Sequence, residues 1–406
     1  MKKSIIIALV ITASLFTVFA QGATDDGPYA GVTNKAYRPT DTNYYDGLNY
    51  SLFRNPADLA NPRFRVQGIS VESSSFNLAN ALQNYSVAES LSNITKLQWD
   101  KKTWINYILG LATEVGSGYN DIVSGGISTG AQLGNSAFGL NFNIVAKSMP
   151  FIDEDGNIDP DKKSILGNGY LPLVEYAVSF GYGRKVIDTD LLSLDVGATV
   201  HLAEKIYMKQ INLDTMSALI NKTMSFDSLP ARGGFAVPVD LGVTLGLLSN
   251  HLKVSAMANN LNGYYYMKNY ENLDAAATLK GGTDSYVLYT PWSISASVIY
   301  SPNFKVVNPT VAFEATDVNL FFQNELDKDS PAKELFKIMN LSAKVDIYDI
   351  LSLRAAYKYG YPEFGVGVGY YGSQIELIYG YHDAGSEYGQ KPVDTLTFRM
   401  KIGYGK

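Results

Sequence analysis

The chain has 406 residues, of which 46 % are hydrophobic, 18 % are charged and none is cysteine. Charged residues normally make up about a quarter of a soluble domain, so charge is scarce here. The absence of cysteine excludes a disulfide scaffold, a thiolate metal site and a cysteine nucleophile. A formal net charge of −6 argues against nucleic acid as a partner. Tyrosine is unusually frequent, with 29 Tyr beside 18 Phe and 3 Trp.

The first residues have the composition of a secretory signal peptide. Two lysines follow the initiator methionine, and residues 5–20 are apolar and end on the small residue Ala20. We expect 1–20 to be a signal peptide cleaved after Ala20, with Ala23 as the alternative site. Loss of the two lysines takes the net charge from −6 to −8. The apolar stretch is short for a stable membrane anchor, so the sequence predicts export from the cytoplasm.

Apolar and polar residues alternate with a period of two through most of the mature chain. The segment 394–404 places Leu396 and Phe398 on one face and Thr397 and Arg399 on the other. This alternation is typical of strands with one apolar and one polar face. Fourteen such strands are expected, at 63–73, 123–133, 135–148, 171–187, 191–211, 234–248, 251–261, 287–301, 308–318, 338–349, 351–360, 363–371, 374–383 and 394–404.

The lengths of these strands and of their connections indicate the fold class. Most of the strands are long enough for a tilted bilayer crossing, which takes roughly 9–11 residues. Short turns alternate with mostly longer loops, as in outer-membrane barrels, whose short turns face the periplasm. A soluble β-sandwich is the alternative, but it would have shorter strands and no such rhythm. The sequence therefore predicts an all-β protein, a 14-stranded antiparallel transmembrane β-barrel in the cell outer membrane.

Residues 21–62 precede the first predicted strand and show no clean period. They are too apolar for a linker, and a barrel of this size needs something to fill its lumen. We therefore expect 21–62 to form an N-terminal luminal hatch and 63–406 to form the barrel. A disordered periplasmic tail is the alternative.

The segment 50–60, with sequence YSLFRNPADLA, resembles the FadL family of outer-membrane long-chain fatty acid transporters and the related TraF-like and PorV-like barrels. Two further stretches look like the family, VDLGV at 239–243 followed by ANNLN at 258–262, and the Gly- and Tyr-rich ending from 351 to 405. The likeness is closest to divergent spirochaete members. It implies a 14-stranded barrel in which Asn55, Pro56 and Ala57 form the hatch motif.

Two departures limit what the resemblance carries over. The chain ends on YGK and lacks the terminal Phe usual in proteobacterial barrels. The family's substrate-contacting residues have no match here, so only the hatch motif is transferred. Pro56 fixes its own φ and biases Asn55 away from the helical region, which predicts a rigid turn at this point. A turn that starts a short helix is the plainer interpretation.

The long extracellular loop 74–122 has apolar residues at near-helical spacing. An amphipathic helix there would offer an apolar groove to an amphiphile, and we expect Leu78, Leu82, Trp104 and Ile108 to contact substrate. A helix that only covers the barrel rim is the alternative.

Charged residues at lumen-facing positions supply two further candidates. Charges that faced lipid would cost about 2–4 kcal/mol each at the midplane, so the charged face is the interior. A carboxylate head group fits the fork of an arginine, which selects Arg354 and Arg399 as substrate-binding residues. Such charges more often pair with one another and fill the lumen.

Chemistry of other kinds finds little support. The acidic segment 153–161 lacks the glycine and the bidentate glutamate of a calcium loop. His201, His251 and His382 stand on separate strands, without a serine and an acid at catalytic spacing along the sequence. We expect no catalytic residue, no metal and no cofactor, and hence no enzyme.

The predicted function is uptake of hydrophobic compounds, long-chain fatty acids first, across the outer membrane through a hatch-gated barrel. The expected partners are a fatty acid or other lipid and the outer-membrane lipids, with the protein a monomer. Two alternatives stay open: a PorV-type barrel that binds or shuttles secreted proteins without transport, and a surface-exposed adhesin. A plugged barrel leaves little room for an aqueous porin.

Overall fold

The computed structural model describes residues 23–24, 47–76, 120–149, 169–208, 218, 223–225, 228–302, 304, 306–324, 335–383 and 392–404. The expected signal peptide, most of the loop 74–122 and the acidic segment 153–161 lie outside these residues. Among the described residues, no helix is both long and apolar enough to cross a bilayer.

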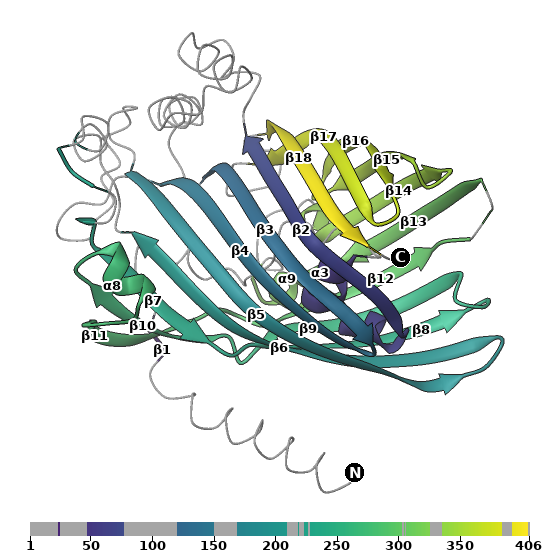
Figure 1. Cartoon of the computed structure of the whole chain (residues 1–406), viewed down its shortest axis with the longest axis horizontal. Coiled ribbons are helices and arrows are strands. Elements are labelled where there is room, and N and C mark those ends of the chain that lie inside the picture. The colour runs from purple at the N-terminus through teal and green to yellow at the C-terminus, as the bar shows by residue number, and fades with distance from the viewer. Residues whose placement is uncertain are drawn as a thin grey trace, which may run out of the picture.

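Strands, antiparallel apart from the two-residue β1, account for most of the described chain (Figure 1). In chain order they are β1 (Ala23–Thr24), β2 (Arg63–Phe76), β3 (Asn120–Gly134), β4 (Ser136–Met149), β5 (Gly169–Asp188), β6 (Leu192–Met208), β7 (Ala231–Ala236), β8 (Val239–Leu247), β9 (Leu252–Leu261), β10 (Tyr264–Tyr270), β11 (Thr283–Tyr289), β12 (Ser293–Tyr300), β13 (Val307–Ala315), β14 (Met339–Ile347), β15 (Leu351–Lys358), β16 (Tyr361–Tyr370), β17 (Ser373–Asp383) and β18 (Pro392–Tyr404). The short helices are α3 (Leu48–Phe53), η2 (Pro56–Ala60), α8 (Leu273–Ala277), α9 (Val318–Asn324) and η5 (Leu335–Ile338).

The sheet closes on itself because the last strand, β18, pairs with β2. At three neighbouring positions of the wall, two strands lie end to end: β7 with β8, β10 with β9, and β11 with β12. Strand β6 pairs with both β7 and β8, and the register continues from one to the other, so each such couple forms one interrupted stave. The two-residue β1 pairs in parallel with β11 and is not counted as a stave. The other strands, with each couple counted as one stave, form the closed 14-stranded antiparallel barrel that the sequence predicts.

The three interruptions correct one expectation. Residues 262–286 were expected to form a loop, but they contain β10, α8 and part of β11. Two of the breaks lie at Pro238 and Pro291, because proline has no N–H to donate to the ladder. The Asn260 side-chain amide bridges two staves by donating to the Thr290 carbonyl oxygen at 2.9 Å. The wall therefore continues across a level where the sequence pattern breaks.

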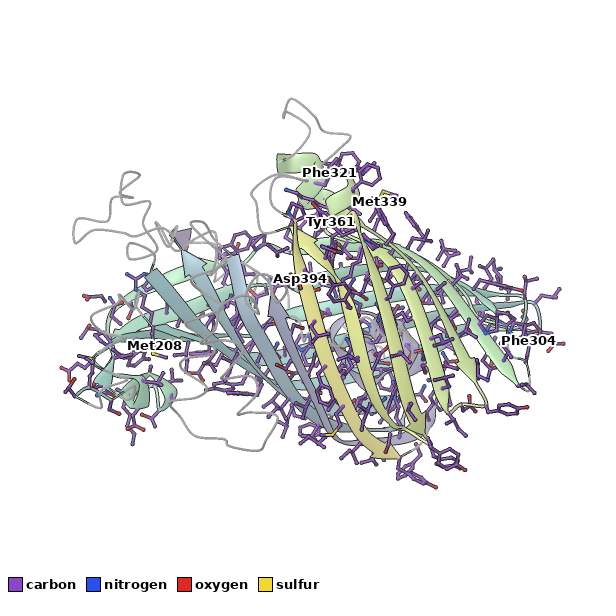
Figure 2. The ribbon with its side chains drawn as sticks, turned by 90° about the horizontal axis from the view of Figure 1, so that it is seen from above. Met208, Phe304, Phe321, Met339, Tyr361 and Asp394 are labelled. Carbon is purple, nitrogen blue, oxygen red and sulfur yellow. The ribbon has the colours of Figure 1, made fainter. Side chains whose placement is uncertain are left out.

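The wall beside β12 is completed by a side chain where a neighbouring strand ends. Strand β13 stops at Ala315 and leaves the start of β12 without a strand partner on that side. The Ile294 N–H donates to Asn319 Oδ1 at 2.7 Å, and Asn319 Nδ2 donates to the Trp292 carbonyl oxygen at 3.1 Å. One amide from α9 thus takes the place of a strand residue. Figure 2 labels Phe321 of α9 close to Met339, where β14 begins.

The strands have two unlike faces, as their alternation predicts. On β4, Phe138, Leu140 and Phe142 point outward and are exposed, while Ala137 and Asn141 point inward and are buried. Side chains project from both surfaces of the wall (Figure 2). An outward apolar band around a closed ladder suits hydrocarbon, since every backbone group within the bilayer must be paired. The protein is therefore an outer-membrane β-barrel.

Tyrosines gather at the end of the barrel with the short turns. Tyr348, Tyr370, Tyr371 and Tyr404 are more than half exposed there, and the rings of Tyr371 and Tyr404 lie 5.6 Å apart. Aromatic rings with a polar edge favour the membrane–water interface, which explains part of the tyrosine surplus. Tyr265 differs from these tyrosines. It lies at the start of β10, within an interrupted stave, and its side chain is only 1 % exposed inside the lumen.

Leu140→Arg tests the lipid-facing surface. Leu140 is outward-facing and near the middle of β4, so the charge would lie in hydrocarbon and cost about 2–4 kcal/mol of folding free energy. We expect a lower folded fraction in urea titrations in phospholipid vesicles, read from the heat-modifiable band in gel electrophoresis. Leu140→Met is the matched control. A Leu140→Arg protein as stable as this control would contradict the assigned outer face.

Candidate functional site

A short segment of chain, 47–61, crosses the lumen and is named here the luminal segment. It contains α3 and η2, and every residue of these two helices is buried. Pro56 occupies the first position of η2, where its missing N–H costs nothing. The Asn55 side chain caps the helix by accepting from the Ala57 N–H at 3.2 Å. The predicted motif therefore forms the turn into a short helix, and that helix lies inside the barrel.

Glycines of the wall make room for this turn. An ideal Cβ built on Gly197 of β6 would lie 2.0 Å from the Pro56 carbonyl oxygen, and one on Gly242 of β8 would lie 2.6 Å from Asn55 Oδ1. On β5, a Cβ at Gly183 would lie 2.3 Å from the Ala60 N atom. No side chain fits in such distances, so glycine is required where the backbone of η2 meets the wall. These residues are named the glycine seat.

Polar side chains tie the luminal segment to three strands, β3, β8 and β9. Asn55 Nδ2 donates to Thr244 Oγ1 at 3.0 Å and to Ser255 Oγ at 3.2 Å. Asn49 Nδ2 donates to Ser128 Oγ at 2.7 Å. These buried side chains would lose their partners if the segment moved. A neutral hydrogen bond contributes only about 0.5–1.5 kcal/mol to stability, but a buried polar group left without a partner is costly.

One ion pair connects the segment to the far wall. Arg54 donates from Nε and Nη2 to the two carboxylate oxygens of Glu314 on β13, at 3.0 Å and 2.6 Å. Both side chains are buried. A forked pair of this kind fixes direction as well as distance. The ion pair joins two residues that are far apart in the sequence, and it holds the turn between α3 and η2 in place.

Asp58 of η2 is surrounded by cationic groups. Its carboxylate lies 3.5 Å from Arg65 Nη2, 3.8 Å from Arg63 Nη2 and 3.8 Å from Lys253 Nζ, and it accepts from Ser51 Oγ at 2.6 Å. Burial by itself raises the pKa of Asp58, but the nearby cations and the Ser51 hydroxyl outweigh burial and hold that pKa below its ordinary value of 3.8. The carboxylate is therefore charged at neutral pH and anchors the segment to β2 and β9.

His201 lies between a serine and an aspartate, contrary to the expectation from sequence spacing. Ser179 Oγ lies 2.8 Å from Nδ1 of the ring, and Asp240 Oδ2 lies 3.1 Å from Nε2. The three residues belong to β5, β6 and β8, so only cross-strand register brings them together. The imidazole stacks on Phe53 of α3 with ring centroids 4.9 Å apart. The three-residue chain thus orients a ring against which the luminal segment rests.

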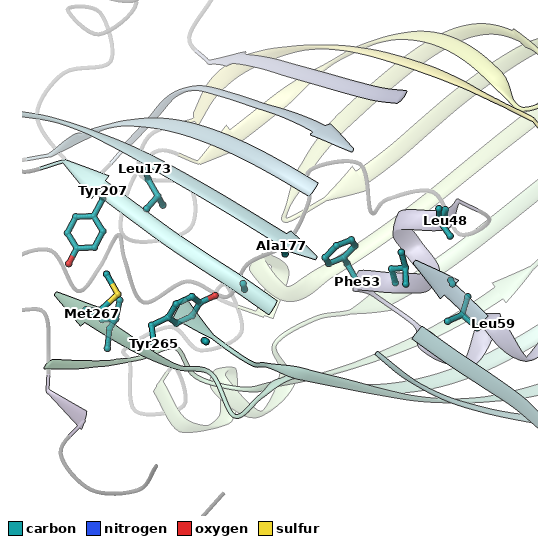
Figure 3. Packing of buried hydrophobic residues seen from close by; sticks show 13 residues of the cluster. Leu48, Phe53, Leu59, Leu173, Ala177, Tyr207, Tyr265 and Met267 are labelled. Carbon is teal, nitrogen blue, oxygen red and sulfur yellow. The ribbon is translucent and has the colours of Figure 1, made fainter. Parts of the chain in front are cut away.

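A buried apolar cluster extends from the luminal segment toward the long loops. It joins Leu52, Phe53 and Leu59 to wall residues of β5, β6, β7, β10 and β11. Figure 3 shows Phe53 beside Ala177, with Tyr265, Leu173, Met267 and Tyr207 farther along the barrel. Hydrophobic and aromatic linings of this kind are usual at sites for apolar ligands. We name this group the luminal cluster.

Two cations lie within the luminal cluster. Lys205 Nζ is 3.4 Å from Glu175 Oε1 and 4.8 Å from the ring centroid of Tyr265. The Arg232 guanidinium lies over the rings of Tyr207 and Tyr286, 6.0 Å and 5.8 Å from their centroids. A cation on an aromatic face is attracted by the negative ring surface. The site therefore offers apolar contacts together with positive charge.

The other half of the lumen, along β14–β18 and β2, is polar. Arg354 pairs with Glu363 at 2.9 Å, and Arg399 pairs with Glu72 at 2.6 Å and with Glu376 at 2.8 Å. Both predicted substrate-binding arginines therefore face the lumen and are held by carboxylates, away from the luminal cluster. Their role toward substrate stays a prediction.

The remaining predicted substrate-binding residues belong to the loop 74–122. Leu78, Leu82, Trp104 and Ile108 lie outside the described residues. Within the described ranges, no group of three His, Asp or Glu side chains is arranged to hold a metal ion.

Comparisons with known proteins give structural likeness only. No family model matches the sequence, and no curated protein sequence matches it. Among solved structures, the chain is similar to the P. putida toluene transporter TodX at 12% identity, over 94% of this chain and 98% of that chain, with a TM-score of 0.41. It is similar to the CymD monoaromatic hydrocarbon channel at 9% identity, over 89% and 94%, with a TM-score of 0.44. It is similar to a Pseudomonas aeruginosa FadL homologue at 10% identity, over 87% of this chain and 93% of that chain, with a TM-score of 0.37.

Gly197→Ala tests the glycine seat. The added Cβ would lie 2.0 Å from a backbone oxygen of Pro56, so the luminal segment must shift. Because the chain has no native cysteine, a single spin label on Gly47→Cys reports that shift. We expect higher label mobility in Gly197→Ala. Gly125→Ala is the control, because its Cβ would meet its nearest atom at 3.4 Å. Equal mobility in both variants would contradict the seat.

Lowering the pH tests whether the Asp58 carboxylate anchors the luminal segment. The folded-state pKa lies below the ordinary 3.8, so the stabilisation is complete above pH 3.8 and is lost as pH falls through the lowered value. We expect the mobility of the label at position 47 to stay constant above pH 3.8 and to rise below it. Asp58→Asn should show raised mobility at neutral pH and a weaker dependence on acid. A profile unchanged by Asp58→Asn would contradict the anchor.

Proposed function

We propose that this protein takes up hydrophobic compounds across the outer membrane and that the luminal segment is its hatch. One observation supports the proposal: the luminal segment lies inside a membrane barrel at the place where a buried apolar cluster ends. An outer-membrane barrel whose only role was structural would need no apolar and aromatic cluster beside its luminal segment. Uptake in one direction requires an apolar lining on the long-loop side of the barrel and a segment below that lining that can move aside.

The substrate would enter from the long-loop end and replace contacts within the luminal cluster. Its apolar body would pack where Tyr265 and Met267 now contact their neighbours, and its leading end would reach Phe53. Because Phe53 belongs to α3 and stacks on His201, displacement of this ring acts directly on the hatch. The resemblance to the FadL family favours the same direction and the same motif.

Movement of the hatch is opposed mainly by polar contacts. The bonds of Asn49 and Asn55 and the buried ion pair of Arg54 with Glu314 would have to be replaced by water or by new partners, because a buried polar group left without a partner is costly. The glycine seat holds η2 by close packing, which water cannot replace. We therefore assign the larger movement to α3 and the hinge to the turn at Arg54 and Asn55.

The cargo class follows from the charges in the luminal cluster. Long-chain fatty acids are the first candidates, because Lys205, which pairs with Glu175, and Arg232 place positive charge beside apolar and aromatic side chains, and a carboxylate is attracted to such charge. Neutral aromatic hydrocarbons are the second, since solved barrels of similar outline are described as toluene and monoaromatic hydrocarbon channels. Transport needs no reaction, because capture of the product beyond the barrel suffices to drive it.

A reversible cross-link tests the hatch. Asn49 Nδ2 and Ser128 Oγ lie 2.7 Å apart, and the native chain has no cysteine. In cells lacking the native protein, the Asn49→Cys/Ser128→Cys variant should take up labelled oleate and labelled toluene when reduced. Oxidation should abolish uptake of whichever cargo is transported, because α3 is then fixed to β3, and reduction should restore it.

Each single-cysteine variant is the matched control and should respond to neither reagent. Oxidised protein that is fully cross-linked yet transports at the reduced rate would rule out the hatch. Cells without the protein that take up oleate, toluene and other hydrophobic probes as fast as wild type would rule out the transport function itself.

A further inference from the structure

The polar half of the lumen contains a cavity at the end of the barrel with the short turns. It has a volume of about 460 Å³ and is bounded by the start of the luminal segment on one side and by β2 and β14–β18 on the other. Asp349 and Tyr371 line it at the turns, and Glu376 and Arg399 line its inner end. Short turns face the periplasm in outer-membrane barrels, so the cavity lies on the periplasmic side. Its volume is that of a pocket for a small organic molecule.

The charged side chains that line the cavity are mostly cationic. Five carry positive charge and three carry negative charge: Arg63, Arg65, Lys344, Arg399 and Lys401 against Asp346, Asp349 and Glu376. The lining therefore has an excess of positive charge, whereas the whole chain has a net charge of −6. Two carboxylates that pair with these cations, Asp58 and Glu72, are not among the described residues that line the cavity. A cavity lined mainly by one sign of charge concentrates ions of the opposite sign.

Arg63 and Lys401 are the lining cations best placed to meet a ligand. The Arg63 guanidinium lies 3.8 Å from Asp58, which is too long for a hydrogen bond, and 28 % of its side chain is exposed. Lys401 stands in the strand register between Gln374 and Ser70, two uncharged residues that line the same cavity. An oxyanion can accept hydrogen bonds from an ammonium, an amide and a hydroxyl group, and the charged donor gives the strongest of these bonds. The composition of the lining therefore favours an oxyanion.

Aromatic rings lie beside these cations at the mouth of the cavity. Tyr370, Tyr371 and Tyr404 line the cavity, and each is more than half exposed. The ring centroid of Tyr371 lies 5.8 Å from that of Tyr370 and 5.6 Å from that of Tyr404. Tyrosines at this level of a barrel meet the membrane–water interface, where one edge of the ring is apolar and the other is wet. An apolar chain can pack on these rings while a charged group reaches the cations inside.

We infer that this cavity binds the oxyanion group of an anionic amphiphile, a carboxylate or a phosphate, at the periplasmic end of the barrel. The oxyanion lies against Lys401 and Arg63, and the apolar chain lies against the three tyrosines. A fatty acid and an anionic phospholipid of the periplasmic leaflet both have this chemistry. Because Gly47, Leu48 and Asn49 form part of the lining, the bound molecule also contacts the start of the luminal segment. This inference does not rest on uptake, since binding is an equilibrium property of the isolated barrel.

Thiol chemistry on the full mature chain in neutral detergent tests the charge of the cavity, because the native chain has no cysteine. The rate with an anionic methanethiosulfonate, divided by the rate with a neutral one, should be higher at Ser70→Cys than at Ser249→Cys, which lies in another short turn outside the cavity. Lys401→Gln should lower this ratio at Ser70→Cys roughly fivefold. Lys268→Gln, which removes the same charge from the exposed face of β10, is the matched control and should leave it unchanged. Gln374→Cys repeats the measurement if Ser70→Cys fails to fold, and the heat-modifiable gel band reports folding.

Protection of the same thiol tests the ligand. Oleate, dioleoylphosphatidylglycerol or both should slow the neutral reagent at Ser70→Cys, and the one that protects identifies the source of the oxyanion. Lys401→Gln should need about tenfold more ligand for the same protection. Glyceryl monooleate has the same chain without the charge and should not protect.

Three results would each overturn the site. They are equal protection by glyceryl monooleate, no protection by either anion, and equal reagent ratios at Ser70→Cys and Ser249→Cys. None of these measurements involves transport, so they leave the hatch proposal untouched.

Discussion

The pairing of β18 with β2 closes the hydrogen-bonded ladder, and the rest of the molecule depends on that closure. A closed ladder leaves no edge to lipid, so the outer face is free to carry Phe, Leu and Ile while the inner face carries charge. The seam also contributes directly to the lumen, because it sets Arg399 beside Glu72. Where the ladder is locally incomplete, a side-chain amide from Asn319 fills the place of a strand.

Closure creates a lumen with two unlike halves. Along β5–β7, β10 and β11 the interior is apolar and aromatic, and along β14–β18 and β2 it is filled with ion pairs and hydroxyl groups. The luminal segment lies between the halves and is fitted to each by different means. The glycine seat of the wall accommodates η2, whereas α3 is held by amide side chains and by one arginine. The luminal segment therefore has an apolar half of the lumen on one side and a polar half on the other.

Periodicity and the lengths of the connections were enough to predict the barrel and its fourteen staves, whereas the motif at Asn55, Pro56 and Ala57 came from the family resemblance and stays a prediction as a hatch. Periodicity failed where contacts cross strands, because a period of two says which face a residue takes but not which residue stands opposite. The meeting of Ser179, His201 and Asp240 and the pairing of Arg399 with two carboxylates both depend on register. The loop expected at 262–286 was wrong because Asn260 side-chain bonds carry the wall across a break.

The position of the luminal segment immediately before β2 has a consequence for assembly. The seam joins residues as far apart in the chain as Glu72 and Arg399, and contacts of such long range form late and slowly. The luminal segment is attached to the first strand of this seam and contacts glycines of β5, β6 and β8. Closure of the barrel and placement of the luminal segment therefore involve the same strand, β2.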